Sequence, residues 1–276
     1  RYLYDVLLAM KENNNVLIPG LDLLRCHENK GYQEILKRQL GIPSLKSWYL
    51  YDLEGTHRLH LTYPLVLKTV TGSNSQGVYL VNSRKELEKI IKRLSFLTLD
   101  RKLDLFRRKY FRLPRKYAEY PDYDNLKDYL QYRAYLDPHP RFILQEFVPG
   151  LRFDYRVLVL FDKLYVEKRH NRKDDFRASG AKKFDFGFEP ETSLLDYARS
   201  LHRKFKAPFL SLDIAYDGDN FYLFEFQALH FGINVYMKNH RFFTDISGSW
   251  ESHTLIPDFE GDLARGLAAY LKNLTG

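Results

Sequence analysis

A chain of 276 residues is long enough to form one or two domains with hydrophobic cores. Its apolar fraction of 45% is typical of a globular protein, and no apolar run reaches the length that spans a membrane. The single cysteine, Cys26, excludes an intramolecular disulfide and a cysteine-based zinc cluster, which favours a reducing, cytoplasmic location. The chain opens at Arg1 without a methionine or a signal peptide, so we expect that part of a natural N-terminus is missing.

The formal charge of +8 is concentrated in one segment of the chain. Residues 92–116 contain ten basic and two acidic residues, whereas the remainder is close to neutral. This distribution argues against a protein built throughout as a nucleic-acid clamp. The segment is either a solvated helical face or a docking place for an acidic peptide or anionic polymer substrate.

The first predicted elements are two helices and a strand pair. Apolar residues have helical spacing over residues 1–12 and 31–40, and a short strand, NVLIPG, is expected between them. Two β-rich segments, 63–70 and 77–82, flank the small polar sequence TGSNSQ. The pattern therefore predicts a loop that joins two strands.

A long helical region follows. Ser83 and Glu86 have the spacing of a capping box, and leucines and isoleucines recur at helical spacing across residues 84–117. The sequence PDYDNLKDYL begins another helix after a proline turn. Residues 142–147 then form a buried strand that ends before a Pro-Gly pair.

The last part of the chain predicts hairpins and two amphipathic helices. Residues 154–169 form two strands that meet at Asp162-Lys163, and residues 193–206 form a helix. Strands at 210–216 and 221–226 flank the turn DGDN, and residues 258–273 form the final helix. This mixture of strands, hairpins and helices predicts an α+β or mixed α/β fold.

The loop after the first strand pair carries a possible phosphate site. Lys68 precedes the small residues Gly72, Ser73, Ser75 and Gly77, whose backbone N–H groups could approach phosphate oxygens. The loop lacks the GxxxxGK[ST] form and joins strand to strand, which excludes a classical P-loop. The alternative is an ordinary solvated hairpin.

The second candidate site contains paired carboxylates. A three-residue loop at Gly218–Asn220 would place Asp213 opposite Glu225 on antiparallel strands, with Gln227 further along the same face. Two neighbouring carboxylates inside a core are costly unless a cation neutralises them, and Mg²⁺ prefers such oxygen ligands. The alternative is a salt bridge to a nearby arginine or lysine.

The third candidate site contains arginines. Asp154 and Arg156 alternate with apolar residues on one strand, as do Glu167 and Arg169 on the returning strand, so each pair shares a face. Together with Arg177, these arginines would suit binding of phosphate or carboxylate. The alternative is a charged surface hairpin.

The order of these segments is more specific than any one of them. In chain order they are HENKGYQEILKRQLGIP, YPLVLKTVTGSNSQGVYLV, ILQEFVPG, DYR, DFRASG and FEFQ. Together they resemble the ATP-grasp superfamily, in the branch of the ribosomal-protein S6 glutamate ligase, glutathione synthetases and D-alanine–D-alanine ligase. The resemblance covers roughly residues 25–235.

The sequence departs from the family pattern in four places. Gln227 stands where the family has asparagine, and Ala178-Ser179 replaces the polar pair after the phosphate arginine. The basic insertion at 92–140 is longer than expected, and the family's N-terminal domain is reduced to about 25 residues. These departures leave the identity of the substrates open.

The resemblance implies an ATP-grasp fold in which two α+β lobes hold ATP between them. Residues 1–40 would be an N-terminal remnant with the lysine helix, 41–144 the smaller lobe with the glycine-rich loop and basic insertion, and 145–276 the larger lobe. Asp213, Glu225 and Gln227 would bind Mg²⁺ or Mn²⁺, while Arg177 and Arg156 would stabilise charge during the reaction. The implied ATP contacts are Lys30, Lys68, Gly72, Ser73, Ser75, Gly77, Gln145, Glu146, Phe147, Val148 and Asp154.

The implied activity is an ATP- and Mg²⁺-dependent carboxylate–amine ligase that forms an amide through an acyl phosphate. Its partners would be small-molecule or peptide carboxylates and amines, with a possible acidic substrate at residues 92–116; membrane and nucleic-acid partners are not expected. Two alternatives remain open. One is an ATP-grasp kinase that phosphorylates a hydroxyl, and the other is a non-catalytic nucleotide- or polyanion-binding module.

Overall fold

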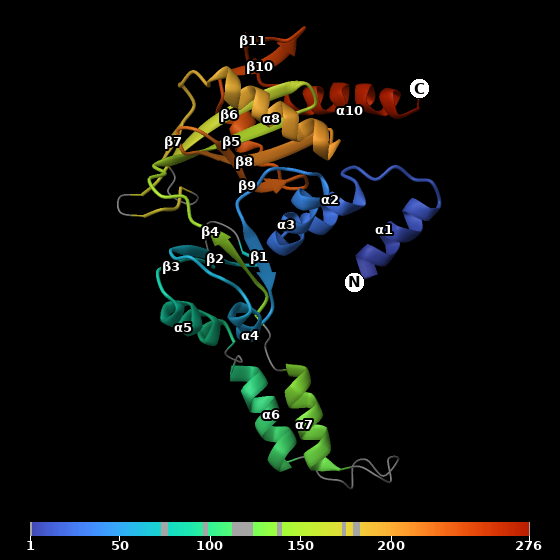
Figure 1. The fold of residues 1–276 in the computed structure, drawn as a ribbon. Helices are drawn as coiled ribbons and strands as arrows, with labels where there is room; N and C mark the ends of the chain where they lie inside the picture. Colours follow the sequence, from blue (N-terminus) through green and yellow to red (C-terminus); the bar gives the residue numbers. More distant parts are fainter. Residues whose placement is uncertain are drawn as a thin grey trace.

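The computed structural model describes residues 2–72, 77–95, 99–111, 124–136, 140–172, 175–178 and 183–275. Two antiparallel sheets with flanking helices confirm the predicted α+β class (Figure 1). Ser73, Ser75, Ser179 and residues 112–116 of the basic segment lie outside the described residues. Within the described chain, no helix is both long and apolar enough to cross a membrane.

The smaller sheet contains the predicted strand pair. Its strands are antiparallel neighbours, and α5 (Arg84–Leu94) covers one face with Leu87, Ile90 and Ile91. The predicted cap of α5 is confirmed, since Ser83 Oγ accepts from the Glu86 N–H at 3.3 Å. In sheet order, the strands are β1 (Ser47–Leu50), β4 (Phe142–Glu146), β2 (Leu65–Thr69) and β3 (Val78–Val81).

A helical hairpin is inserted between α5 and β4. The predicted helical region 84–117 divides into α5 and α6 (Leu99–Phe111), and α7 (Asn125–Leu136) returns beside α6. The pair projects away from both sheets (Figure 1). Polar contacts join the two helices: Arg108 lies 3.5 Å from Asp128 and 3.5 Å over the Tyr132 ring. Residues 99–111 of the basic segment thus form one helix of a projecting arm (Figure 1).

The larger sheet contains both predicted hairpins. The first turns at Phe161-Asp162, one residue earlier than predicted, and Phe161 has a φ of +59°. Short α4 (Leu53–His57) lies between the first two strands in the chain, and β7 (Phe184–Asp185) pairs with β6. In sheet order, the strands are β11 (Ser249–Thr254), β10 (Arg241–Ile246), β6 (Lys163–His170), β5 (Phe153–Leu160), β8 (Phe209–Tyr216) and β9 (Phe221–Gln227).

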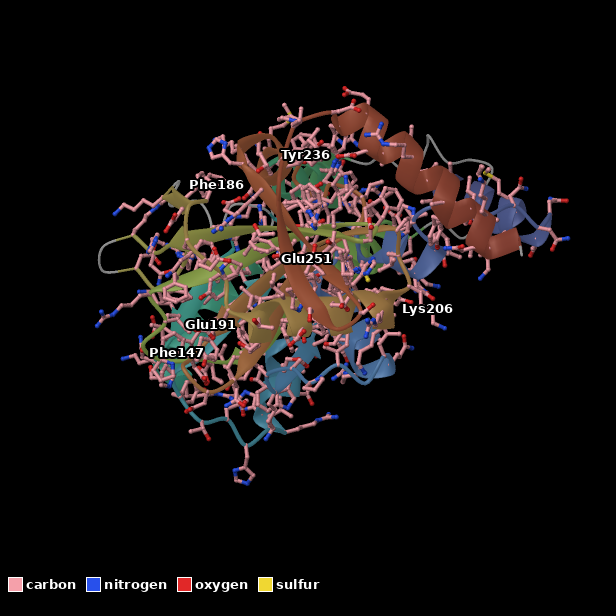
Figure 2. All side chains as sticks on the ribbon, turned by 90° about the horizontal axis from the view of Figure 1, so that it is seen from above. Phe147, Phe186, Glu191, Lys206, Tyr236 and Glu251 are labelled. Atoms are coloured by element: carbon pink, nitrogen blue, oxygen red, sulfur yellow. The ribbon has the colours of Figure 1, made fainter. Side chains whose placement is uncertain are left out.

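Strand alternation divides the residues of β5 between two cores. Val157 and Val159 pack in the core that contains α8 (Thr192–Phe205), whereas Leu158 and Leu160 pack in the core with α9 (Asn234–Lys238) and α10 (Phe259–Thr275). Seen from above, α10 lies along the flank of the sheet near Tyr236, whose hydroxyl donates to Asp262 at 2.8 Å (Figure 2). Asp154 and Arg156 extend the Leu158 face toward the smaller sheet.

Three N-terminal helices precede the first strand. They are α1 (Tyr2–Glu12), α2 (Leu21–Cys26) and α3 (Lys30–Gln39). The strand predicted at NVLIPG is wrong: residues 15–20 are not in a strand, and Pro19 lacks the N–H that a strand ladder needs. Asn29 caps α3, and α3 contacts β1, β4 and β9, so this helix links the two sheets.

Candidate active site

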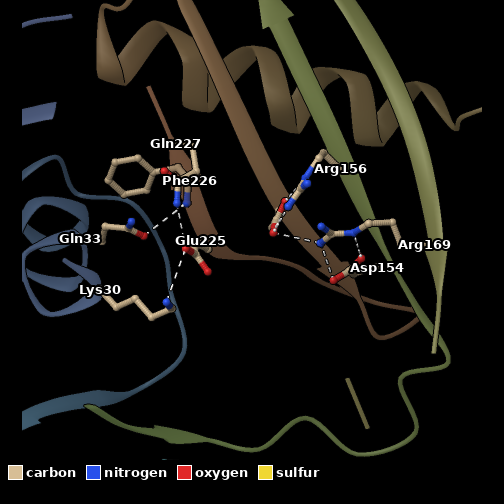
Figure 3. Close-up of polar contacts among 9 residues, drawn as sticks. Lys30, Gln33, Asp154, Arg156, Arg169, Glu225, Phe226 and Gln227 are labelled. Carbon is tan, nitrogen blue, oxygen red and sulfur yellow. Dashed lines mark hydrogen bonds and ion pairs between the residues drawn. The ribbon is translucent and has the colours of Figure 1, made fainter. Parts of the chain in front are cut away.

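Lys30 opens α3 and points into the space between the sheets. Its backbone N–H donates to the Val70 carbonyl at 3.0 Å, and its ammonium donates to the Gly72 carbonyl. The same ammonium lies 3.9 Å from Glu225 on β9 (Figure 3). Lys30 therefore connects the loop of the smaller sheet with the carboxylate strand of the larger one.

Lys68 reaches the same space from β2. Its ammonium donates to Gln145 Oε1 at 2.6 Å and lies 5.3 Å from the ring centre of Phe224 on β9. Burial lowers the pKa of Lys68 to about 8. Gln145 is 2% exposed, and its Nε2 has no hydrogen-bond partner among the described residues. A buried donor without a partner fits a ligand acceptor, such as a ring nitrogen of adenine.

A buried ion pair on α3 supports the two lysines, and the sequence analysis did not identify it. Lys37, fully buried, lies 2.6 Å from Glu34 and donates to the Leu223 carbonyl at 3.2 Å. Ser47 on β1 donates to Glu34 at 2.8 Å. The signal was present in the sequence, because opposite charges three residues apart share one side of a helix. This pair ties α3 to strands of both sheets.

The predicted pairing of Asp213 with Glu225 is confirmed, but the turn differs from the prediction. Tyr216 pairs with Phe221 across a four-residue turn, and an irregularity after Asp213 restores the register. Gln227 Nε2 donates to Glu225 Oε1 at 3.0 Å, so these two side chains lie together as predicted (Figure 3).

Two arginines form ion pairs with Asp213. Arg156 donates to both carboxylate oxygens, at 2.8 and 3.0 Å, and Arg169 lies 3.0 Å from Oδ2 (Figure 3). Arg169 also donates to both oxygens of Asp154, at 2.6 and 2.8 Å. The salt-bridge alternative for Asp213 is therefore realised in this structure. Because Arg169 is 3% exposed and Glu167 4%, the alternative of a charged surface hairpin is wrong.

The charges of this cluster alter its acidities. Burial alone would raise the pKa of Asp213, but the guanidinium groups of Arg156 and Arg169 hold it well below its ordinary value. Burial raises the pKa of Asp154 to about 6 and also raises that of Glu167. Of these three carboxylates, Asp213 is thus the one whose charged form the neighbouring groups favour.

The predicted metal ligands are suited to a hard cation. Among the described residues, no three His, Cys, Asp or Glu side chains could hold a metal ion together, so the set depends on the Gln227 carboxamide. Among the described residues, Asp213 Oδ1 accepts a hydrogen bond from Arg156 alone, which leaves a lone pair for a monodentate contact. Two carboxylates and an amide oxygen are ligands that Mg²⁺ accepts. The donor set therefore fits Mg²⁺, although Arg156 and Arg169 neutralise Asp213 here.

The described glycines of the loop have backbone conformations that favour glycine. Gly72 has a φ of +120° and Gly77 a φ of +73°. A Cβ at Gly77 would lie 2.0 Å from Thr69 Oγ1, while Thr69 N donates to the Gly77 carbonyl at 2.8 Å. β2 and β3 are antiparallel neighbours, as expected for a loop that joins two strands.

The remaining predicted residues lie around this centre. Glu146 accepts from the Lys46 N–H at 3.3 Å, and Phe147 packs edge-on against Phe176 with ring centres 6.0 Å apart. Val148, which follows β4, is half-buried. Arg177 pairs with Asp175 at 2.9 Å and donates to the Val78 carbonyl at 3.2 Å, so it lies at the edge of β3. The structure does not place Arg177 in contact with the Asp213 cluster.

No protein-family model and no curated protein sequence matches this chain. Solved structures do match it. A RimK-domain ATP-grasp protein from Sphaerobacter thermophilus superposes with a TM-score of 0.54 and 12% identity, covering 86% of this chain and 73% of its own. An L-amino acid ligase from Bacillus licheniformis gives 0.52 and 17%, covering 83% and 49%, so this chain spans about half its length.

A third match is the ATP-grasp ligase PsnB in complex with a minimal precursor. Its TM-score is 0.52 and its identity 17%, and the match covers 98% of this chain and 68% of PsnB. At these identities the three likenesses concern the fold.

Proposed function

This chain has the ATP-grasp fold, and on that premise we propose that it is an ATP- and Mg²⁺-dependent ligase that joins a carboxylate to an amine and forms ADP. The observation that carries the proposal is the meeting of Lys30 and Lys68 with Glu225 between the two sheets. Cationic groups and oxygen ligands in one buried space suit a metal-bound polyphosphate. Gln145, with its unpartnered Nε2, would contact the base.

The proposed lobes follow the two sheets. The smaller lobe, residues 41–144, would carry the glycine-rich loop, and the larger lobe, 145–276, the metal ligands, with α3 of residues 1–40 between them. β4 belongs to the smaller sheet as far as Glu146, so its last two residues extend across the proposed boundary. Glu146, Phe147 and Val148 would then line the adenine site where the chain passes between lobes.

In the proposed reaction, a substrate carboxylate oxygen attacks the γ-phosphorus of ATP, and the bond to the β-phosphate oxygen breaks. An amine nitrogen then attacks the carbonyl carbon of the resulting acyl phosphate, the bond to the phosphate oxygen breaks, free phosphate leaves, and the nitrogen gives up a proton as the amide forms. Lys30 and Lys68 would offset phosphate charge, and Arg156 with Arg177 would stabilise the charge that develops. Asp213, Glu225 and Gln227 would hold Mg²⁺, which would neutralise further charge on the phosphates.

Several finer assignments belong to the same proposal. Asp154 and the loop residues Gly72 and Gly77 would border the phosphates, with Mn²⁺ able to replace Mg²⁺. The enzyme would act on small-molecule or peptide substrates in the cytoplasm. Of the basic segment, residues 92–95 and 99–111 are described, and their exposed lysines and arginines remain a candidate docking place for an acidic substrate.

The test is to incubate the protein with Mg-ATP and pools of amino acids, peptides and sugar acids, and to follow ADP and dehydrated conjugates by mass spectrometry. A ligase yields ADP, free phosphate and a conjugate only when an amine is present. Phosphate esterified to the acceptor would show a kinase instead.

The site assignment is tested by Asp213→Asn and Glu225→Gln. Both should lose the thermal stabilisation that Mg-ATP gives the wild type, while Glu251→Gln, at an exposed carboxylate on β11, should keep it. If both site variants are stabilised by Mg-ATP as strongly as the wild type, the metal and nucleotide assignment is wrong.

A further inference from the structure

β3 forms the outer edge of the smaller sheet. The strand order is β1-β4-β2-β3, and no described strand pairs with the outer side of β3. An edge strand presents backbone N–H and C=O groups that another extended chain can pair with.

Three hydrogen bonds decide the direction of the backbone groups. Thr69 N donates to the Gly77 carbonyl at 2.8 Å, so Gly77 faces β2, and strand alternation turns Val78, Leu80 and Asn82 outward. Two contacts on the outer side agree with this direction. Arg177 donates to the Val78 carbonyl at 3.2 Å, and the Asn82 N–H donates to Glu86 at 2.8 Å. Leu80 lies between these two contacts, and its N–H and C=O point away from the sheet.

A pocket of about 410 Å³ adjoins this part of β3. α5 contributes the basic residues Lys89 and Arg93, which are exposed, and the segment after β6 contributes Phe176 and Arg177. Arg93 lies 5.1 Å over the Tyr79 ring, which fixes the guanidinium beside the pocket. The one lining carboxylate, Glu86, already accepts from Asn82. The pocket therefore combines an outward-facing peptide unit with an excess of positive charge.

We propose that the β3 edge binds an extended peptide segment that carries an acidic side chain. The peptide backbone pairs with the N–H and C=O of Leu80, and its carboxylate lies against Lys89 and Arg93. The inference rests on the proposed function and deepens it by naming a peptide as the carboxylate substrate. A free anion could bind to Lys89 and Arg93, but only a peptide can also form backbone hydrogen bonds with the N–H and C=O of Leu80.

The probe is an N-terminally fluorescein-labelled Thr-Val-Glu-Val-Glu-Val-Thr-amide, titrated with the whole chain and followed by fluorescence anisotropy. Its comparators are a Glu-to-Gln version and a version with an N-methyl group on every residue, which cannot donate to a strand from either of its edges. Each comparator should bind about tenfold more weakly, a difference of about 1.4 kcal/mol.

Charge-reversed variants identify the place of binding. Lys89→Glu and Arg93→Glu should each weaken the acidic probe about tenfold, whereas Lys92→Glu, exposed on α5 but outside the pocket, should not. If Arg93→Glu disturbs folding by removing the contact with Tyr79, Lys89→Glu still tests the site, because it leaves that contact intact. Equal weakening by Lys92→Glu would mean general charge attraction, and an N-methylated probe that binds unchanged would exclude strand pairing; either overturns the proposal.

Mg-ATP stabilisation measured on the same proteins separates this proposal from the proposed function. Lys89→Glu should keep the full nucleotide effect while losing the peptide. A wild type that binds the probe but is not stabilised by Mg-ATP would refute the ligase and leave the peptide site standing.

Discussion

Replacing Lys68 by methionine would measure the cost of holding an ammonium between the two sheets. Burial lowers the pKa of Lys68 from 10.5 to about 8 in the folded chain, while the unfolded chain keeps the ordinary value. Between these two pH values the unfolded state binds more protons, so the wild type gains stability as the pH rises from 8 to 10.5. A shift of this size corresponds to about 3 kcal/mol.

The assay is urea unfolding of the wild type and of Lys68→Met at several pH values from 7 to 10.5. Subtracting the two curves removes the titration of other groups. At pH 7 the variant avoids the buried charge, but Gln145 Oε1 loses its 2.6 Å donor, which costs about 1–3 kcal/mol, so the two proteins should be of similar stability.

The wild type should then become more stable relative to Lys68→Met by about 3 kcal/mol as the pH reaches 10.5. Lys92→Met, at an exposed lysine of α5, should show no such change against the wild type. Parallel curves for the wild type and Lys68→Met would refute the argument that Lys68 is held in a desolvated place.

Three further predictions concern stability. Arg169→Met leaves Asp154 and Asp213 buried without their shared partner, so it should lower the free energy of unfolding in urea by about 3–5 kcal/mol. Arg58→Met breaks an exposed pair with Glu54 and should lower it by less than about 1 kcal/mol; equal losses would contradict the buried network. Burial lowers the pKa of His202 to about 4, so this residue binds fewer protons in the folded state than in the unfolded one. The free energy of unfolding should therefore fall by about 3 kcal/mol between pH 6.5 and 4. His202→Gln should abolish this loss, and His60→Gln, at an exposed site, should retain it. Gly77→Ala should lower the melting temperature more than Gly218→Ala, because both have positive φ but only Gly77 would bring its Cβ to 2.0 Å from Thr69; equal shifts would mean that the loop relaxes.

Much of the fold could be predicted because its elements have strong local signals. The cap at Ser83 and the periodicity of α8 require only the sequence, and the two hairpins of the larger sheet have alternating strands around short turns. β1 was missed because its residues form a strand through pairing with a distant partner, Ser47 with Gln145. The β10–β11 hairpin was also missed, although it pairs locally around the turn at Ser247-Gly248, where both residues have a positive φ.

The site was predictable to the level of strand faces and no further. Alternation places Arg156 and Asp154 on one face, but it cannot reveal that β8 lies beside β5 and brings Asp213 opposite Arg156. The Asp213–Glu225 register came out right although the predicted loop was one residue too short, because the irregularity in β8 and β9 compensates. A bulge depends on tertiary packing and leaves little trace in the sequence.

The charges of the site are arranged as two neighbouring groups of opposite sign. Lys30, Lys37 and Lys68 outnumber Glu34 and Glu225 by one positive charge, whereas Asp154, Glu167 and Asp213 outnumber Arg156 and Arg169 by one negative charge.

In the proposed ligase, the lysines of the first group would face the phosphates, while Glu225 of the first group and Asp213 of the second would hold the cation. Arg156 and Arg169 neutralise Asp213, and the Glu225 carboxylate lies 3.9 Å from the Lys30 ammonium. Mg-ATP would therefore exchange ion pairs that exist beforehand, instead of neutralising bare charges. Asp213 and Glu225 thus have partners of opposite charge within the chain, which offsets the cost of burying these carboxylates.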